Sequence, residues 1–227
     1  MLGRRHPPVD TESYSATGRS CGWPLTNVAV IAVGWGVFTW IVPVYVRSQL
    51  GVGPRLIGLL VFANALTVVL AQIPVTKLAE GRRRMVAMAT ASVTFVVACL
   101  LVVGASLIGS DDVFAVLLAA VIIVGVGECF HTTALMPLVA DLAAEALRGR
   151  YMAMMGLSWR LGLALAPTLG LQLLSVSPSA ALLAAAAVAF GAGLAALALE
   201  RELPPSIRLT PRPARPRTSA PATEPAA

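Results

Sequence analysis

Long apolar segments, separated by short polar ones, make up most of the sequence between residues 25 and 200. A helix needs about 20 apolar residues to cross the hydrocarbon core of a bilayer, and six segments reach that length. None of them alternates strictly between polar and apolar positions, which favours helices over the strands of a membrane barrel. The pattern therefore predicts an all-α membrane protein with six transmembrane helices, at residues 25–46, 57–76, 85–108, 113–140, 151–174 and 180–199.

Polar segments flank this transmembrane bundle of residues 25–200 on both sides. Residues 1–24 are mostly polar, and the apolar run that follows them is too long for a cleavable signal peptide. We expect a flexible cytoplasmic leader there. Residues 201–227 are rich in Pro, Ala, Thr and Arg and contain few large apolar side chains, so we expect a disordered cytoplasmic tail.

The composition excludes a water-soluble globular protein. Of the 227 residues, 57% are hydrophobic and 12% are charged, whereas soluble domains have about 45–50% apolar and about 25% charged residues. The chain has three cysteines, and Cys99 and Cys129 lie inside apolar segments, which excludes a disulfide-stabilised scaffold. The lipid bilayer is therefore the first expected partner.

The basic residues are distributed unevenly between the two sides of the predicted bundle. Fourteen of the 17 Lys and Arg residues lie in the leader, in the tail, or in the polar segments after the second and fourth helices. Arg47 and Arg55 lie on the opposite side, and Arg160 lies inside a helix. The positive-inside rule then predicts a multi-pass protein of the plasma membrane with both termini in the cytoplasm. Since this topology accounts for the net charge of +6, we expect no nucleic-acid partner.

Short motifs at the helix ends resemble those of a known transporter family. The motifs are Pro-x-Tyr at 43–45, Leu-Gly at 50–51, Ile-Gly at 57–58, Gly-Arg-Arg-Arg at 81–84, Arg-Gly-Arg at 148–150 and Ala-Pro at 166–167. A proline also follows Glu128 in the fourth predicted helix, and the acidic residue Asp141 lies just after that helix. Together they resemble one six-helix half of a major facilitator superfamily transporter of the multidrug-efflux-like branch, over about residues 25–200. The resemblance implies a 3+3 inverted-repeat half bundle.

The basic turn at 81–84 indicates which half the chain resembles. Pro74 and Leu78 stand where the N-terminal half of the family has Gly and Asp, so the turn is more similar to that of the C-terminal half. Such transporters hold the substrate between two halves, and the resemblance therefore implies a second copy or a separate six-helix half as partner. Transport of a small solute, with or without proton-coupled efflux, is the leading hypothesis. A truncated, non-transporting fragment and a structural or regulatory membrane protein remain open as alternatives.

An intramembrane enzyme is less consistent with the sequence. The chain has neither the Gly-x-Ser-x-Gly nor the His-Glu-x-x-His motif, and its two histidines, His6 and His131, are far apart. We therefore expect no enzymatic activity, no cofactor and no metal site.

Polar residues inside the predicted helices are the candidates for a substrate or proton pathway. Inserting a charged residue at the centre of a membrane helix costs about 2.5–3.5 kcal/mol of free energy, so the presence of Glu128 and Arg160 in predicted helices needs a structural or functional explanation. They could form a structural ion pair between neighbouring helices, which we expect, or serve transport. His131, three residues after Glu128, could relay protons or be a hydrogen-bonded structural residue. Asn64 and Gln72 share one helix face and could join helices or line a cavity.

Charged residues at the cytoplasmic helix ends are candidates for gating. Topology alone explains the arginines, and the family resemblance adds salt bridges that form and break between conformations. We expect one of Arg82, Arg83 and Arg84 to pair with Asp141 or Glu145. The full set of gating candidates is Arg82, Arg83, Arg84, Asp141, Glu145, Arg148 and Arg150.

Overall fold

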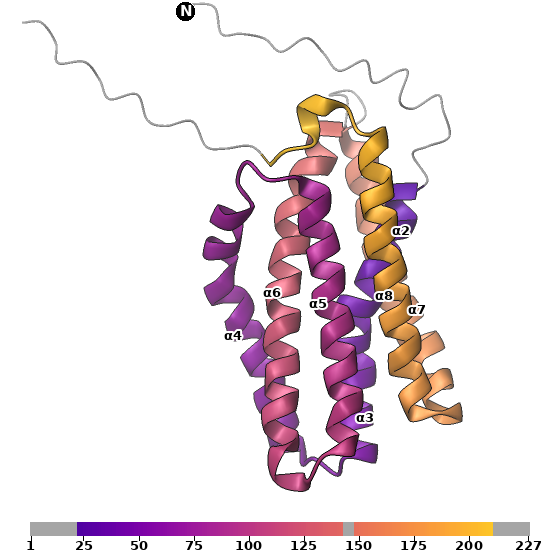
Figure 1. Cartoon of the computed structure of the whole chain (residues 1–227). Helices are drawn as coiled ribbons and strands as arrows, with labels where there is room; N and C mark the ends of the chain where they lie inside the picture. The colour runs from indigo at the N-terminus through magenta and orange to yellow at the C-terminus, as the bar shows by residue number, and fades with distance from the viewer. Residues whose placement is uncertain (1–21, 143–147, 211–227) are drawn as a thin grey trace, which may run out of the picture.

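The computed structural model describes residues 22–142 and 148–210, and apart from one isolated β-bridge their regular structure is helical (Figure 1). The first membrane-spanning segment consists of α2 (Gly22–Ile31), the π-helix η2 (Ala32–Ile41) and α3 (Val42–Gln49). The remaining elements are α4 (Pro54–Ala79), α5 (Arg84–Gly104), η3 (Ala105–Leu107), α6 (Ser110–Leu142), α7 (Arg148–Val176), α8 (Pro178–Leu199), η5 (Glu200–Glu202) and η6 (Pro205–Ile207). The predicted all-α fold class is confirmed.

Within the described ranges, six helical segments are long and apolar enough to cross a membrane. Each of them overlaps one predicted apolar segment, and all but the third extend beyond that segment at both ends. The fifth, for example, begins at Arg148, although the apolar pattern begins at Tyr151. Helices run past the hydrocarbon boundary because their polar end residues can reach the aqueous interface.

The helices form an antiparallel bundle in which α5 has a central place (Figure 1). It packs between α6 and α8, and α4 packs against the other side of α6. The α2–η2 segment packs against α7. The chain connections after α4 and α8 lie at the same end of the bundle (Figure 1).

Small residues allow the first span to lie very close to α7. A Cβ atom added to Gly36 would lie 2.2 Å from the Cβ of Ala166, and one added to Gly162 would lie 2.8 Å from the carbonyl oxygen of Val28. Such contacts leave no room for a larger side chain, so the backbones meet directly, as is common between membrane helices.

The beginning of the predicted disordered tail is ordered in the structure. Residues 207–210 return to the loop after α4, where an isolated β-bridge joins Arg83 and Leu209. The amide of Arg84 donates to the carbonyl of Arg208 (2.9 Å), and the amide of Thr210 donates to the carbonyl of Arg82 (2.9 Å). Composition predicts disorder for residues 201–227, but over 201–210 these backbone bonds and the burial of Leu203 and Ile207 hold the chain in place. The leader up to residue 21 and the tail from residue 211 lie outside the described residues.

Candidate functional site

A cavity of about 150 Å³ lies within the membrane-spanning part of the bundle. It is bounded by η2, α3, α4 and α6, and its wall is mostly apolar. The π-helix η2 contributes the aromatic side chains of Trp35 and Phe38, while α4 and α6 contribute the polar side chains of Asn64 and Glu128. Two of the candidates identified in the sequence therefore line one cavity.

Glu128 is buried in this cavity beside an amide instead of a cation. Its side chain is within reach of Asn64, whose Nδ2 lies 3.5 Å from Oε1 and also donates to the carbonyl of Val121 at 3.2 Å. Among the described residues Glu128 forms no ion pair, since the salt bridges there are Arg83–Glu200 and Arg84–Asp141. A carboxyl group placed in this way has no fixed counter-charge.

The expected pair between Glu128 and Arg160 is absent from the structure. Arg160 is exposed on α7, and α7 packs mainly against the first span and only slightly against α6. The prediction assumed that helices joined by a short connection pack together. Here the glycines of α7 favour the first span as its neighbour, as the close approach of Gly162 to Val28 shows.

His131 belongs to a second polar cluster that joins three helices. Its Nε2 lies 3.1 Å from Oδ1 of Asn27 on α2, and Nδ2 of Asn27 donates to the hydroxyl of Ser158 on α7 at 2.6 Å. His131 and Asn27 are completely buried. The ring of Trp35 lies 5.5 Å from that of His131. Trp35 also lines the cavity, so its side chain lies between the cavity and the polar cluster.

Asn64 and Gln72 share one helix face, as their spacing predicted, and this face meets α6. Gln72 donates to the hydroxyl of Thr133 at 3.2 Å, and the hydroxyls of Thr76 and Thr133 are also 3.2 Å apart. These bonds connect α4 to α6, in addition to those that Asn64 makes with the same helix. Gln72 does not line the cavity that contains Glu128.

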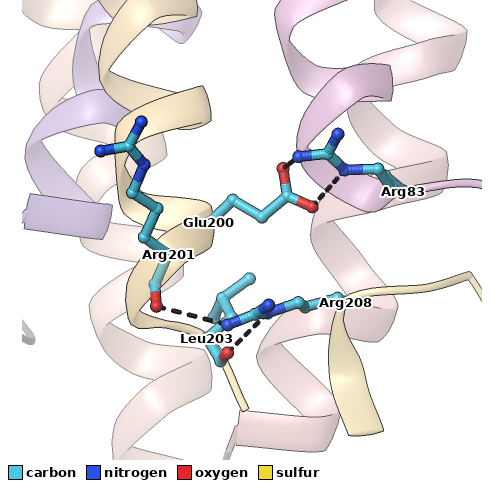
Figure 2. Close-up of polar contacts among 5 residues, drawn as sticks. All are labelled: Arg83, Glu200, Arg201, Leu203 and Arg208. Atoms are coloured by element: carbon cyan, nitrogen blue, oxygen red, sulfur yellow. Dashed lines mark hydrogen bonds and ion pairs between the residues drawn. The ribbon is translucent and has the colours of Figure 1, made fainter. Parts of the chain in front are cut away.

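Arginine–carboxylate pairs connect the helix ends at the basic side of the bundle. Nη2 of Arg84 lies 2.5 Å from Oδ2 of Asp141, which is one of the pairs expected from the sequence. Arg83 instead binds Glu200 through two bonds of 2.6 Å each (Figure 2). The hydrogen bonds and charge of Glu200 raise the pKa of the Arg83 guanidinium further above its ordinary value.

The other gating candidates form no comparable contacts. Arg82, Arg148 and Arg150 are exposed, and no hydrogen bond or ion pair of their side chains is found within the described ranges. Glu145 lies outside the described residues. Nor do residues 22–142 and 148–210 contain a group of three or more His, Cys, Asp or Glu side chains that could hold a metal ion.

Several residues in these networks were not identified from the sequence, among them Asn27, Thr133, Ser158 and Glu200. Asn27 and Ser158 are uncharged polar residues within largely apolar segments, as Asn64 is, and the same criterion would have found them. Glu200 lies at the end of the last apolar segment. An acidic residue at the end of a membrane helix does not by itself indicate a polar network, so its role could not be predicted without its partner. Its pairing with Arg83 depends on the packing of α5 against α8.

Comparison with known proteins agrees with this architecture. The sequence model of the Major Facilitator Superfamily matches residues 25–225. A search of curated proteins finds no match. The matched range contains all six membrane-spanning segments and covers most of the chain. The chain therefore belongs to the Major Facilitator Superfamily, a family of membrane transporters.

Proposed function

We propose that the chain is a six-helix half of a proton-coupled transporter that exports small amphipathic cations from the cell. The observation that carries this proposal is the position of Glu128, a carboxyl group without a cationic partner in a cavity walled by Trp35 and Phe38. An aromatic wall attracts the apolar and cationic parts of such a solute. The carboxylate can bind either the cation or a proton, and competition between the two couples their movements.

The polar cluster beside the cavity supports a proton pathway. His131 is hydrogen-bonded to Asn27, and its other ring nitrogen, Nδ1, has no partner within the described ranges. Trp35 contacts the His131 ring and also lines the cavity, so a change at either site can be transmitted through this side chain. Ionisable residues within a membrane commonly mark substrate or proton routes.

A second six-helix body completes the proposed transporter. Arg160 lies about 18 Å along α7 from its start, close to the middle of the helix, and is exposed. A charge at that depth is stable when it faces another protein body or an aqueous cavity. Since α4 and α7 are the least buried of the six spans, we propose that they face a partner half. This partner is a second copy or a separate half, and the chain itself corresponds to a C-terminal half of the multidrug-efflux-like branch.

Transport by purified protein tests the proposal. Proteoliposomes carrying an imposed pH gradient are expected to accumulate ethidium, an amphipathic cation, and Glu128→Gln should reduce uptake to the rate of protein-free vesicles. Glu202→Gln, the same substitution at an exposed position, is the matched control and should keep the wild-type rate. Cross-linking in the same vesicles is expected to trap a dimer of the chain.

Two results would count against this function. Gradient-driven uptake that is undiminished in Glu128→Gln would remove Glu128 from the pathway. A folded protein that transports none of a set of amphipathic cations, either alone or with a six-helix partner, would favour the non-transporting alternative.

A further inference from the structure

A second, larger cavity lies at the basic end of the bundle. Its volume is about 570 Å³, within the range of about 300–1,000 Å³ that is usual for small-molecule sites. Its charged lining comes from Arg83 at the start of α5 and from Glu200, Arg201 and Arg208 at and after the end of α8 (Figure 2). Three cations and one anion give this cavity an excess of two positive charges.

The hydrogen bonds leave most of this positive charge uncompensated. Glu200 is engaged on both oxygens by Arg83 (Figure 2). Arg208 donates from Nε to the carbonyl of Leu203 at 2.8 Å and from Nη2 to the carbonyl of Arg201 at 3.3 Å. These acceptors are neutral, so they hold the guanidinium in place without cancelling its charge. The Arg201 side chain has no hydrogen bond or ion pair with any described residue.

The rim of the cavity is apolar and continues into the membrane surface of the protein. Leu197 and Leu209 line the cavity beside the arginines, and both side chains are exposed. On α8, Phe190, Leu194 and Leu197 form an exposed stripe with the spacing of one helix face. The stripe leads from the hydrocarbon region to the arginines, which is the order of apolar and charged groups in a phospholipid.

We propose that this cavity binds the phosphate headgroup of an anionic phospholipid of the surrounding membrane. The Arg208 guanidinium, which is held in place by two carbonyls, contacts the phosphate. The Arg201 side chain, which points away from Arg208 in Figure 2 and is held by no bond to a described residue, turns toward the same phosphate on binding, and an acyl chain lies along the Phe190–Leu197 stripe of α8. Guanidinium groups suit phosphate because they offer several N–H donors in one plane. The inference depends on the chain lying in a membrane and not on the proposed transport activity.

Lipid retention by the full chain tests this site. Delipidated protein in detergent is titrated with phosphatidylglycerol or with phosphatidylcholine of the same acyl chains, and bound lipid is counted by native mass spectrometry. Phosphatidylglycerol is expected to bind more tightly. Arg201→Gln should weaken its binding about 5-fold, the effect of one basic residue near a membrane surface, and the double variant with Arg208→Gln about 25-fold.

The controls separate a defined site from general charge attraction. Arg150→Gln removes the same charge from an exposed position at the start of α7 and should leave binding unchanged. Equal losses in Arg150→Gln and Arg201→Gln would overturn the proposal, as would equal binding of the two lipids. Because the Arg201 side chain holds no other group in place, a lower affinity in this variant cannot come from a displaced segment. Displacement of the lipid by inorganic phosphate at comparable concentration would assign the cavity to a soluble anion and reject the lipid.

Discussion

Ionisable side chains in this bundle differ in whether a group of opposite charge accompanies them. Arg84 is almost fully buried, with 1% of its side chain exposed, and is bound to Asp141 and to the carbonyl of Leu209. Glu128 is also buried but meets only the amide of Asn64. A buried ionisable group with a bonded partner holds one arrangement of the helices, whereas one without such a partner is free to exchange protons or ligands. We therefore propose different roles for the two residues despite their similar burial.

The Arg84–Asp141 pair yields a test by double substitution. Arg84→Gln and Asp141→Asn should each lower the free energy of unfolding by about 1–3 kcal/mol. The first removes the bonds to Asp141 and to the carbonyl of Leu209, and the second leaves the buried Arg84 guanidinium without its charged partner. The double variant should lose no more than Arg84→Gln alone, since the pair is already broken. Thermal unfolding in detergent measures all three.

Arg82→Gln is the matched control for this cycle. Arg82 precedes the same helix, but its side chain is exposed and forms no hydrogen bond or ion pair with a described residue, so its loss should remain within about 0.5 kcal/mol. Strictly additive losses in the double variant would show that Arg84 and Asp141 act independently.

At the scale of the elements, the first span is the least regular helix and lies in close contact with α7. Its middle is the π-helix η2, Ala32–Ile41, and π-helical turns are frequent at functional sites. This segment presents Trp35 to the cavity and Gly36 to Ala166 of α7. The same ten residues therefore supply both part of the cavity wall and one of the close contacts with α7.

Gly36→Ala should destabilise the fold by about 1–3 kcal/mol, the usual cost of overpacking. The added methyl group would overlap the Cβ of Ala166, so Ala166→Gly in the same chain should restore most of the loss. Gly58→Ala is the matched control, because Gly58 lies inside α4 with nothing within 4 Å of the added atom. That variant should be neutral or gain up to about 1 kcal/mol from helix propensity. Equal effects of the two glycine substitutions would contradict the close contact.

The sequence predicts each helix but only part of the packing between helices. Apolar length alone identifies all six spans, and the spacing of Asn64 and Gln72 predicts that they share one helix face, although only the structure shows that this face meets α6. The neighbours of α7 could not be predicted in this way, because side-chain fit at Gly162 decides them. Order over residues 201–210 was missed for a similar reason, since backbone pairing with the loop after α4 leaves no trace in composition.

For the whole molecule, the two ends of the bundle differ strongly in charge. Of the basic residues that the structure describes at the helix ends, Arg47 and Arg55 lie at the end formed by α3 and the start of α4, while all the others gather at the opposite end. Because loops rich in Lys and Arg are retained in the cytoplasm, we propose that the cavity lined by Arg201 and Arg208 faces the cytoplasm.

Reporter fusions test this orientation. Alkaline phosphatase fused after residue 110 or 177 should be active, because these positions lie at the end proposed to face outward, and a fusion after residue 81 should be inactive. Green fluorescent protein at the same positions should give the opposite pattern. Phosphatase activity after residue 81 would reverse the proposed orientation.

The backbone pairing of residues 207–210 also imposes an order on biosynthesis. Arg84 leaves the ribosome well before its acceptor Leu209, which follows it by 125 positions. Until then, the amide of Arg84 lacks the carbonyl of Arg208, and its guanidinium lacks that of Leu209. The backbone pairing at the basic end can therefore form only after the sixth span has been translated, and in a nascent chain released earlier these donors are left to water.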